Sequence, residues 1–123
     1  MNRLVLALLL LVSLSVSAKQ LPCSIHLAKD TSASSLPGLA KISHADAQKA
    51  ALARINASSK QVADGELEIE QGCLIYSFDI RNSGKTGIEE IWVDAGTGKI
   101  LSHKHESPKQ EAAELAKDKA SSK

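Results

Sequence analysis

The sequence is poor in aromatic side chains, with one Trp, one Tyr and one Phe in 123 residues. After residue 18 it also lacks any apolar run near the roughly 20 residues needed to span a bilayer. Its formal net charge is only +1, so no strong field favours nucleic acid or an anionic membrane surface as a partner. A chain of this length can form one small domain, which excludes a large enzyme.

The first 18 residues have the organisation of a secretory signal. Arg3 supplies the positive start, an apolar run follows from Leu4 to Val16, and Val16-Ser17-Ala18 offers a small-residue cleavage site. We expect cleavage to leave a neutral mature chain that begins at Lys19, has no membrane span and is secreted or periplasmic. An uncleaved membrane anchor is the alternative.

The remaining chain divides by composition and periodicity. Residues 19–37 are rich in Ser, Thr, Ala and Pro without sustained periodicity, which predicts an irregular arm. A helix is predicted at about 43–57, because Ser43 and Asp46 resemble a capping box before an Ala-rich helical face. Residues 106–123 hold one large apolar side chain, so this polar tail is expected to be a frayed helix or disordered.

Between the helix and the tail, the pattern is that of strands. Strict alternation from Glu66 to Glu70 indicates a strand that is buried on one face. Further strands are predicted at about 73–82, 88–95 and 99–103, separated by Gly-containing turns. In the second strand, one face carries Leu74, Tyr76, Phe78 and Ile80. The fold class is therefore α+β, with one N-terminal helix packed on a small antiparallel sheet of three to four strands.

Three segments resemble the PepSY domain family, which is named for its presence in propeptides of secreted metallopeptidases and in other exported bacterial proteins. They are KISHADAQKAALA from Lys41 to Ala53, LIYSFDI from Leu74 to Ile80 and IEEIWVDAGTGKIL from Ile88 to Leu101. The last is the most specific, because its residue types and their spacing both match. The resemblance covers about residues 38–103, and the corresponding domain is expected to span 38–105.

The resemblance implies one helix on an antiparallel sheet, a role in restraining or escorting peptidases, and no catalytic residue. Because no peptidase domain follows this segment, inhibition is expected to act on a separate protein. Asp94 and Thr97 are expected to bond turn amides, and Gly98 to adopt the positive φ of a tight hairpin.

The chain has two cysteines, Cys23 and Cys73. In a small exported domain they are most simply one disulfide, because the compartment is oxidising and the core is marginal. Such a loop stabilises the fold by about 4 kcal/mol on the chain-entropy estimate. Two free thiols or an intermolecular bridge are the alternatives.

Strand parity gives this disulfide a consequence. Ile75 and Trp92 are predicted to share a face with Cys73, away from the helix. A Cys23–Cys73 bond would draw the arm across this face, so that its apolar residues cover the two side chains. The covering residues are predicted to be Leu21, Ile25 and Leu27. The alternative is that Ile75 and Trp92 form an open patch that binds a protein partner.

The same face carries a group of acidic residues. Glu66, Glu68 and Glu70 point the same way, and Glu90 and Asp94 are expected beside them. The simplest interpretation is a solvated sheet face. The functional one is a docking surface for a basic partner or for Ca²⁺, with Glu66, Glu68 and Glu70 as partner-binding residues.

His103 and His105 form a His-x-His pair on the last predicted strand, a spacing that can chelate Cu²⁺ or Zn²⁺. Glu106 or the distant His26 would have to add a ligand. Exposed surface histidines are the simpler interpretation.

No nucleophile elbow, Cys-His pair with an orienting acid or His-Glu-x-x-His motif occurs, so neither catalysis nor a cofactor is predicted. We therefore expect an exported, non-catalytic module that binds a protein, preferably a secreted or cell-envelope peptidase. The alternative is a periplasmic metal-binding or metal-sensing module that uses His103 and His105.

Overall fold

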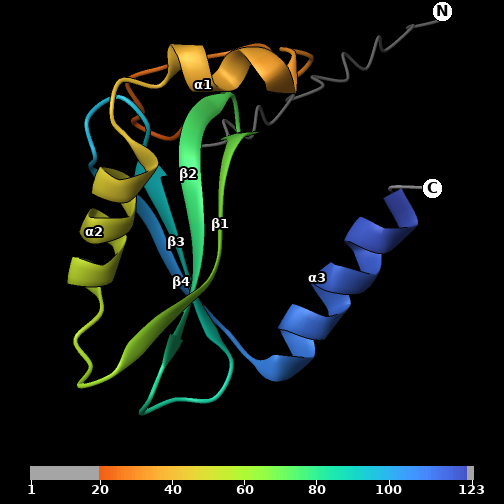
Figure 1. The fold of residues 1–123 in the computed structure, drawn as a ribbon. Coiled ribbons are helices and arrows are strands. Elements are labelled where there is room, and N and C mark those ends of the chain that lie inside the picture. The colour runs from red at the N-terminus through yellow and green to blue at the C-terminus, as the bar shows by residue number, and fades with distance from the viewer. Residues whose placement is uncertain (1–19, 122–123) are drawn as a thin grey trace, which may run out of the picture.

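The structure, a computed structural model, describes residues 20–121, so the predicted signal segment and its cleavage site lie outside the described residues. Figure 1 shows the order of the elements. They are η1 (Ala33–Ser35), α1 (Leu36–Leu39), α2 (His44–Arg54), β1 (Lys60–Glu70), β2 (Cys73–Asn82), β3 (Ile88–Asp94), β4 (Ile100–Glu106) and α3 (Pro108–Ser121).

The four strands form one antiparallel sheet in the order β1-β2-β3-β4. Helix α2 packs on one face of this sheet, and α3 lies on the opposite side (Figure 1). The predicted α+β class is confirmed. Among the described residues, no helix has the length and apolar character required to cross a bilayer.

Helix α2 begins where the sequence predicts and ends earlier. The Ser43 side chain accepts a hydrogen bond from the Asp46 amide at 3.1 Å, which caps the first turn. The last helical residue is Arg54 rather than a residue near 57. The Lys60 ammonium donates to the carbonyls of Leu52 and Ile55, at 2.7 Å each, and so satisfies the end of the helix.

Strand β1 begins at Lys60 and is therefore longer than the predicted alternation from Glu66 to Glu70. A register shift between Val62 and Asp64 breaks the period-2 pattern, which conceals the first half of the strand. Gln71 and Gly72, with φ of 50° and 77°, join β1 to β2 in a two-residue turn. This turn pairs Glu70 with Cys73, so the predicted parity of β2 is kept.

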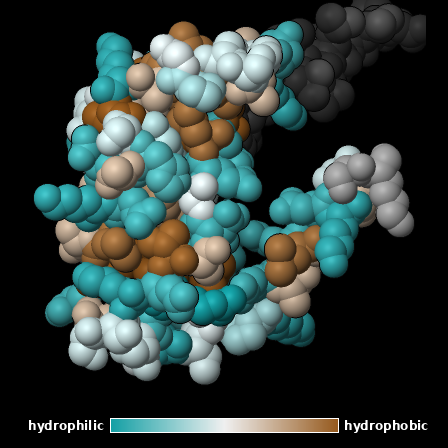
Figure 2. Space-filling view, in the orientation of Figure 1, coloured by the Kyte–Doolittle hydropathy of each residue, from teal (hydrophilic) through white to brown (hydrophobic). Residues whose placement is uncertain are grey.

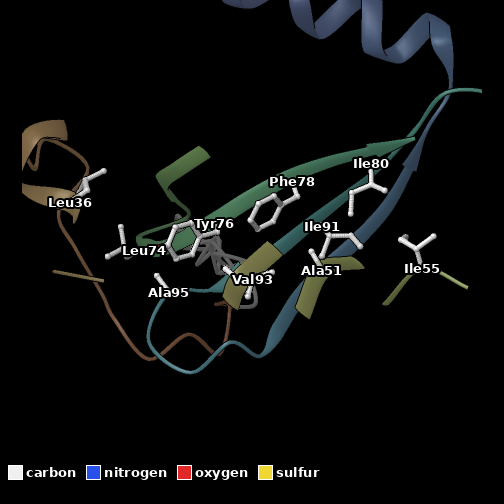
Figure 3. Close-up of a cluster of buried hydrophobic side chains, with 11 residues drawn as sticks. Leu36, Ala51, Ile55, Leu74, Tyr76, Phe78, Ile80, Ile91, Val93 and Ala95 are labelled. Atoms are coloured by element: carbon white, nitrogen blue, oxygen red, sulfur yellow. The ribbon is translucent and has the colours of Figure 1, made fainter. Parts of the chain in front are cut away.

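The main core lies between α2 and the sheet (Figure 3). Alternate residues of β2 and β3 meet the small side chains of α2, which let the helix approach closely. The fully buried side chains include Ala47, Ala51, Leu74, Phe78, Ile80, Ile91 and Val93.

A second, smaller cluster lies on the other face of the sheet, where the Cys23–Cys73 disulfide ties the arm to β2. Ile75 is fully buried there and Trp92 is 9% exposed. The arm therefore covers these two side chains, and the alternative of an open Ile75 and Trp92 patch is not what the structure has.

Of the three predicted covering residues, Leu21 is confirmed and the other two lie elsewhere. Leu21 of the arm and Leu101 of β4 pack against the second cluster, whereas Ile25 and Leu27 pack against the main core. The arm backbone pairs with the start of β2, since the Leu74 amide donates to the Ile25 carbonyl at 3.0 Å. The side chain of Ile25 consequently faces the same way as that of Leu74.

The end of β3 joins three segments through Asp94 and the residue that follows it. The Asp94 Oδ1 atom accepts the Ser24 amide of the arm at 3.2 Å, and Oδ2 accepts the Thr97 hydroxyl at 2.6 Å. The Ala95 carbonyl accepts the Lys41 amide, just before α2, at 2.9 Å. Gly98 has φ of 78°, as predicted for the turn.

Strand β4 extends beyond its predicted bounds, and the tail takes the helical one of its two expected forms. Strand β4 runs to Glu106 rather than ending near 103, and the tail forms helix α3. Over all of α3, which the structure describes in full, no side chain is buried. The helix therefore stands beside the sheet without a core of its own.

We expect Asp94→Asn to lower the free energy of unfolding by about 1.5–3 kcal/mol, the usual value of charge-assisted hydrogen bonds. Burial raises the pKa of Asp94, but the hydrogen bonds from Thr97 and Ser24 outweigh it and hold the pKa below 3.8. The stabilisation is thus present above that pH and is lost as the pH falls. Urea unfolding at pH 7 and pH 3 measures both effects. Equal midpoints for Asp94→Asn and the exposed control Asp30→Asn at pH 7 would contradict them.

Replacing both cysteines with serine should lower the free energy of unfolding by up to about 4 kcal/mol, because the bond closes a 50-residue span. Trp92, the single tryptophan, should become more hydrated as the arm detaches. Chemical unfolding and tryptophan emission test this. The control is Lys29→Ser, at an exposed position of the same arm. An unshifted emission in the double variant would show that the arm stays docked without the bond.

Candidate functional site

An acidic hollow lies between the outer face of the sheet and α3, with a volume of about 270 Å³. Figure 2 shows hydrophilic residues on both sides of the gap beside α3. We call this site the acidic hollow and define it by its lining residues: Asp64, Glu66, Glu68, Glu70, Ser77, Asp79, Ile88, Glu90, Glu106, Glu111, Glu114, Leu115 and Asp118. Among these lining residues, all of them described by the structure, there is no lysine, arginine or histidine.

The sheet supplies its acids through strand parity. Glu66, Glu68 and Glu70 alternate along β1 and face away from α2, as the sequence predicts. Antiparallel pairing then sets Asp79 of β2 directly between Asp64 of β1 and Glu90 of β3. Carboxylates on three adjacent strands are thereby brought together on one face.

Helix α3 supplies the opposite wall. Its acids Glu111, Glu114 and Asp118 are spaced three and four residues apart, so they share one face of the helix. An ion pair between Arg81 and Glu111, at 3.0 Å, links the helix to β2. Leu115, 56% exposed, adds an apolar wall between the acids.

The charge of Glu68 is poorly compensated. Burial raises the pKa of Glu68 to about 7, and the charges of Glu70 and Glu66 add to the rise. A hydrogen bond with Ser77 acts in the opposite direction without cancelling it. Because the ionised form is disfavoured, this carboxylate would gain from a cation placed beside it.

At the other end of the hollow, the charge of Glu106 is also poorly compensated. It is 8% exposed, and burial raises its pKa to about 7, with the charges of Glu90 and Glu114 adding to the rise. Carboxylate oxygens of Glu90, Glu106 and Glu114 lie within 4.8 Å of one another. Sheet and helix thus meet at this end through like charges.

Two more carboxyl groups have raised pKa values. Burial is the largest cause for Asp79, followed by the charge of Asp64. Burial also raises the pKa of Glu90, the charge of Asp79 adds to it, and Lys104 opposes it. Lys104 itself lies over the Trp92 ring, with its ammonium 5.5 Å from the ring centroid.

Asp94, which the sequence placed beside these acids, is not part of the hollow. It is 2% exposed and its carboxylate serves the turn and the arm. Its pKa lies below the ordinary value, whereas those of Glu68, Asp79, Glu90 and Glu106 are raised. Sequence parity alone could not separate Asp94 from Glu90, because both face outward on β3.

The His103 and His105 rings both meet one buried carboxylate, that of Glu89, which sequence analysis did not identify. His103 Nε2 lies 3.0 Å from one Glu89 oxygen, and His105 Nδ1 lies 3.2 Å from the other. Arg54 Nε donates to His103 Nδ1 at 3.4 Å, which leaves the proton on Nε2 for Glu89. Glu89 also accepts the Lys85 ammonium at 3.3 Å.

This arrangement stabilises the ionised form of Glu89. Burial raises its pKa, but hydrogen bonds from His103 and His105 outweigh that effect and lower it. The inward ring nitrogens therefore have a structural partner without any metal. Glu106 and His26, named as third ligands, belong to the hollow and the arm instead. A metal site at His103 and His105 stays a prediction.

The acids of α3 and Glu106 were not assigned to this face, because the tail was expected to be a frayed helix or disordered. Their signal was the helical spacing of Glu111, Glu114 and Asp118 behind a Ser-Pro start. Asp64 was missed together with the first half of β1. Glu89 gave no signal, since its neighbours come from β4 and the β2–β3 turn.

Comparison with known families supports the sequence resemblance. Residues 41–104 match the PepSY family, described as peptidase propeptide and YPEB domain. This confirms the resemblance that three sequence segments carried. No curated protein and no solved structure matches the chain.

We expect the free energy of unfolding to fall as the pH rises from 5 to 8. Glu68 and Glu106 have folded pKa values of about 7, above the ordinary 4.5, so their stabilisation is complete below that value and is lost through pH 7. Glu68→Gln and Glu106→Gln should each flatten the profile, measured by chemical unfolding. Asp30→Asn, outside the hollow, should run parallel to the unmodified protein. A profile that rises from pH 5 to 8 would contradict a dependence on these two carboxyl groups.

Proposed function

Because the chain belongs to the PepSY family, we propose that it is an exported, non-catalytic module that binds and regulates a peptidase. The family description, peptidase propeptide, supports the class of partner. The Cys23–Cys73 disulfide supports an oxidising compartment, outside the cytoplasm, as the place of action. Inhibition and escort are the two forms that such regulation takes.

The acidic hollow is the observation that carries the proposal beyond the family. We assign to it a segment of the peptidase that bears lysine or arginine side chains. Ten of the thirteen lining residues are acidic. Charge complementarity therefore selects a basic segment over an acidic or neutral one.

The raised pKa values make such binding favourable for a physical reason. An ammonium or guanidinium group placed beside Glu68 or Glu106 offsets the repulsion that now opposes ionisation. Basic side chains consequently gain more in the hollow than at an exposed, well-hydrated carboxylate. Proton release on binding at neutral pH is the thermodynamic sign of this coupling.

The apolar residues of the hollow fit the same occupant. Ile88 and Leu115 line it among the carboxylates. The methylene stem of a lysine or arginine can pack on these two side chains while its charged end reaches the acids. A hydrated metal ion gains no free energy from contact with such an apolar surface.

A partner bound in the hollow would lie next to an edge of the sheet. β1 is an edge strand, and its residues Glu66, Glu68 and Glu70 form one side of the hollow. An extended segment can thus lie along β1 with α3 on its other side. A peptidase segment bound in this way could not contact the peptidase's own substrate, which would inhibit the enzyme. The same binding would also keep the peptidase attached while it is escorted.

The test begins with a peptidase captured from cell-envelope extract and continues with the purified pair. Added protein should change the activity of the captured peptidase, and the effect should weaken as salt rises. Glu66→Gln, Glu68→Gln and Glu70→Gln together should weaken binding about tenfold, from three pairs worth roughly 0.5 kcal/mol each. Titration calorimetry measures the affinity.

Asp30→Asn, an exposed acid outside the hollow, serves as the control and should bind like the unmodified protein. A peptidase bound equally by the triple variant would retain the function and overturn the assignment to the hollow. Failure of any envelope peptidase to bind or respond would overturn the function itself.

A further inference from the structure

A second cluster of chemically reactive groups lies at the disulfide, on the far side of the sheet from α2. The His26 ring lies against Cys23, with its Nδ1 atom 3.6 Å and its Nε2 atom 4.0 Å from the sulfur. Ligand atoms of Cys23, His26 and Cys73 all lie within 4.8 Å of one another. Two sulfurs and one imidazole are the donor set of thiophilic metal ions.

These three residues are held together by the backbone as well as by the disulfide. His26 pairs with Cys73 in an isolated antiparallel bridge. On either side of it, the Leu74 amide donates to the Ile25 carbonyl at 3.0 Å and the Leu27 amide donates to the Gly72 carbonyl at 2.9 Å. Reduction of the disulfide breaks none of these backbone hydrogen bonds, and an ion bound by all three side chains would hold the arm to β2 in place of the S–S bond.

The distances suit a tetrahedral ion. With Zn–S bonds of about 2.3 Å and Zn–N bonds of about 2.0 Å, a sulfur and a nitrogen ligand lie roughly 3.6 Å apart. The Cys23 sulfur and His26 Nδ1 are already at 3.6 Å. The Cys73 sulfur lies within 4.8 Å of the His26 ligand atom and is bonded to the Cys23 sulfur, so it must move away from that sulfur, which rotation of the cysteine side chains allows once the bond is broken. His26 is exposed, so water can complete the coordination.

We propose that reduction of the Cys23–Cys73 disulfide creates a Cys₂His site for Zn²⁺ or a similar thiophilic cation. A dithiol supplies two electrons and two protons, its own sulfurs become a disulfide, and Cys23 and Cys73 become thiols. Binding of Zn²⁺ releases both thiol protons to water, so two thiolates balance the charge of the ion. Reoxidation by a disulfide reverses the exchange and releases the ion.

This proposal is independent of the acidic hollow and of the peptidase role. The hollow offers carboxylate oxygens, which suit hard cations, whereas this site offers sulfur and nitrogen. The oxidised protein therefore offers the carboxylate ligands of the hollow, whereas the reduced protein also offers the sulfur and nitrogen ligands of this site. Two of the three proposed ligands, Cys23 and His26, belong to the arm.

The experiment compares the oxidised protein with protein reduced by a phosphine, which is then removed without oxygen. Zinc is titrated in competition with a chromophoric chelator, and Co²⁺ reports thiolate ligation by its sulfur-to-metal absorption. The reduced protein should bind one Zn²⁺ and show the thiolate absorption with Co²⁺. The oxidised protein should show neither.

Variants identify the ligands. Cys23→Ser and Cys73→Ser should each remove the thiolate absorption or halve it, and His26→Ala should weaken zinc binding by ~tenfold or more. His26 is exposed, so its replacement leaves the oxidised fold intact, which circular dichroism verifies. The matched control, His103→Ala with His105→Ala, should leave zinc binding of the reduced protein unchanged.

Three outcomes would overturn the proposal. The first is equal zinc binding by the oxidised and reduced proteins. The second is an unchanged zinc affinity in His26→Ala. The third is the absence of zinc binding by the reduced chain, whether it is folded or unfolded. Loss of binding in the His103 and His105 double variant alone would place the metal at β4 instead.

Discussion

The buried carboxylate of Asp94 is the interaction on which the arrangement of the segments depends. It stands at the end of β3, where the strand must turn, and it is the acceptor for both the turn and the arm. The adjoining Ala95 carbonyl holds the chain that leads into α2. One short stretch of backbone thus fixes the positions of the arm, the helix and the last hairpin. A small domain with few large side chains gains much from such a shared anchor.

The buried or half-buried carboxylates of this molecule divide into two kinds. Asp94 and Glu89 have hydrogen-bond donors, and their pKa values are lowered. Glu68 and Glu106 face other carboxylates, and their pKa values are raised to about 7. The first pair holds the fold together, whereas the second pair opposes it at neutral pH. Retaining an unfavourable arrangement of this size makes physical sense where a cationic group from another molecule relieves it.

The outer face of the sheet shows how far local sequence patterns lead. Alternation placed Glu66, Glu68 and Glu70 on one face, and the same parity placed Ile75 and Trp92 beside Cys73. The two-residue turn at Gln71 and Gly72 preserved that parity, so both placements agree with the structure. Contacts between distant segments were harder to predict. The face on which Ile25 lies depends on the bridge between His26 and Cys73. The periodicity of the arm sequence gives no indication of that pairing.

The same distinction explains what was missed elsewhere. The bulge in β1 removes the alternation from residues that nevertheless pair with β2, so the first half of the strand has no period to detect. Helix α3 has regular spacing but little apolar surface, and composition alone is a poor guide to such a helix. Glu89 is surrounded by groups from two other segments. Its role becomes visible only when the sheet is assembled.

The position of the arm in the chain has a consequence for the order in which the molecule is completed. The arm is synthesised first, yet the residues that hold it, Cys73 and Asp94, come much later. Cys23 therefore has no intramolecular partner until a further 50 residues have followed it. The N-terminal segment is made early and docks late. Throughout that interval, the thiol of Cys23 can react with other thiols and disulfides in its surroundings.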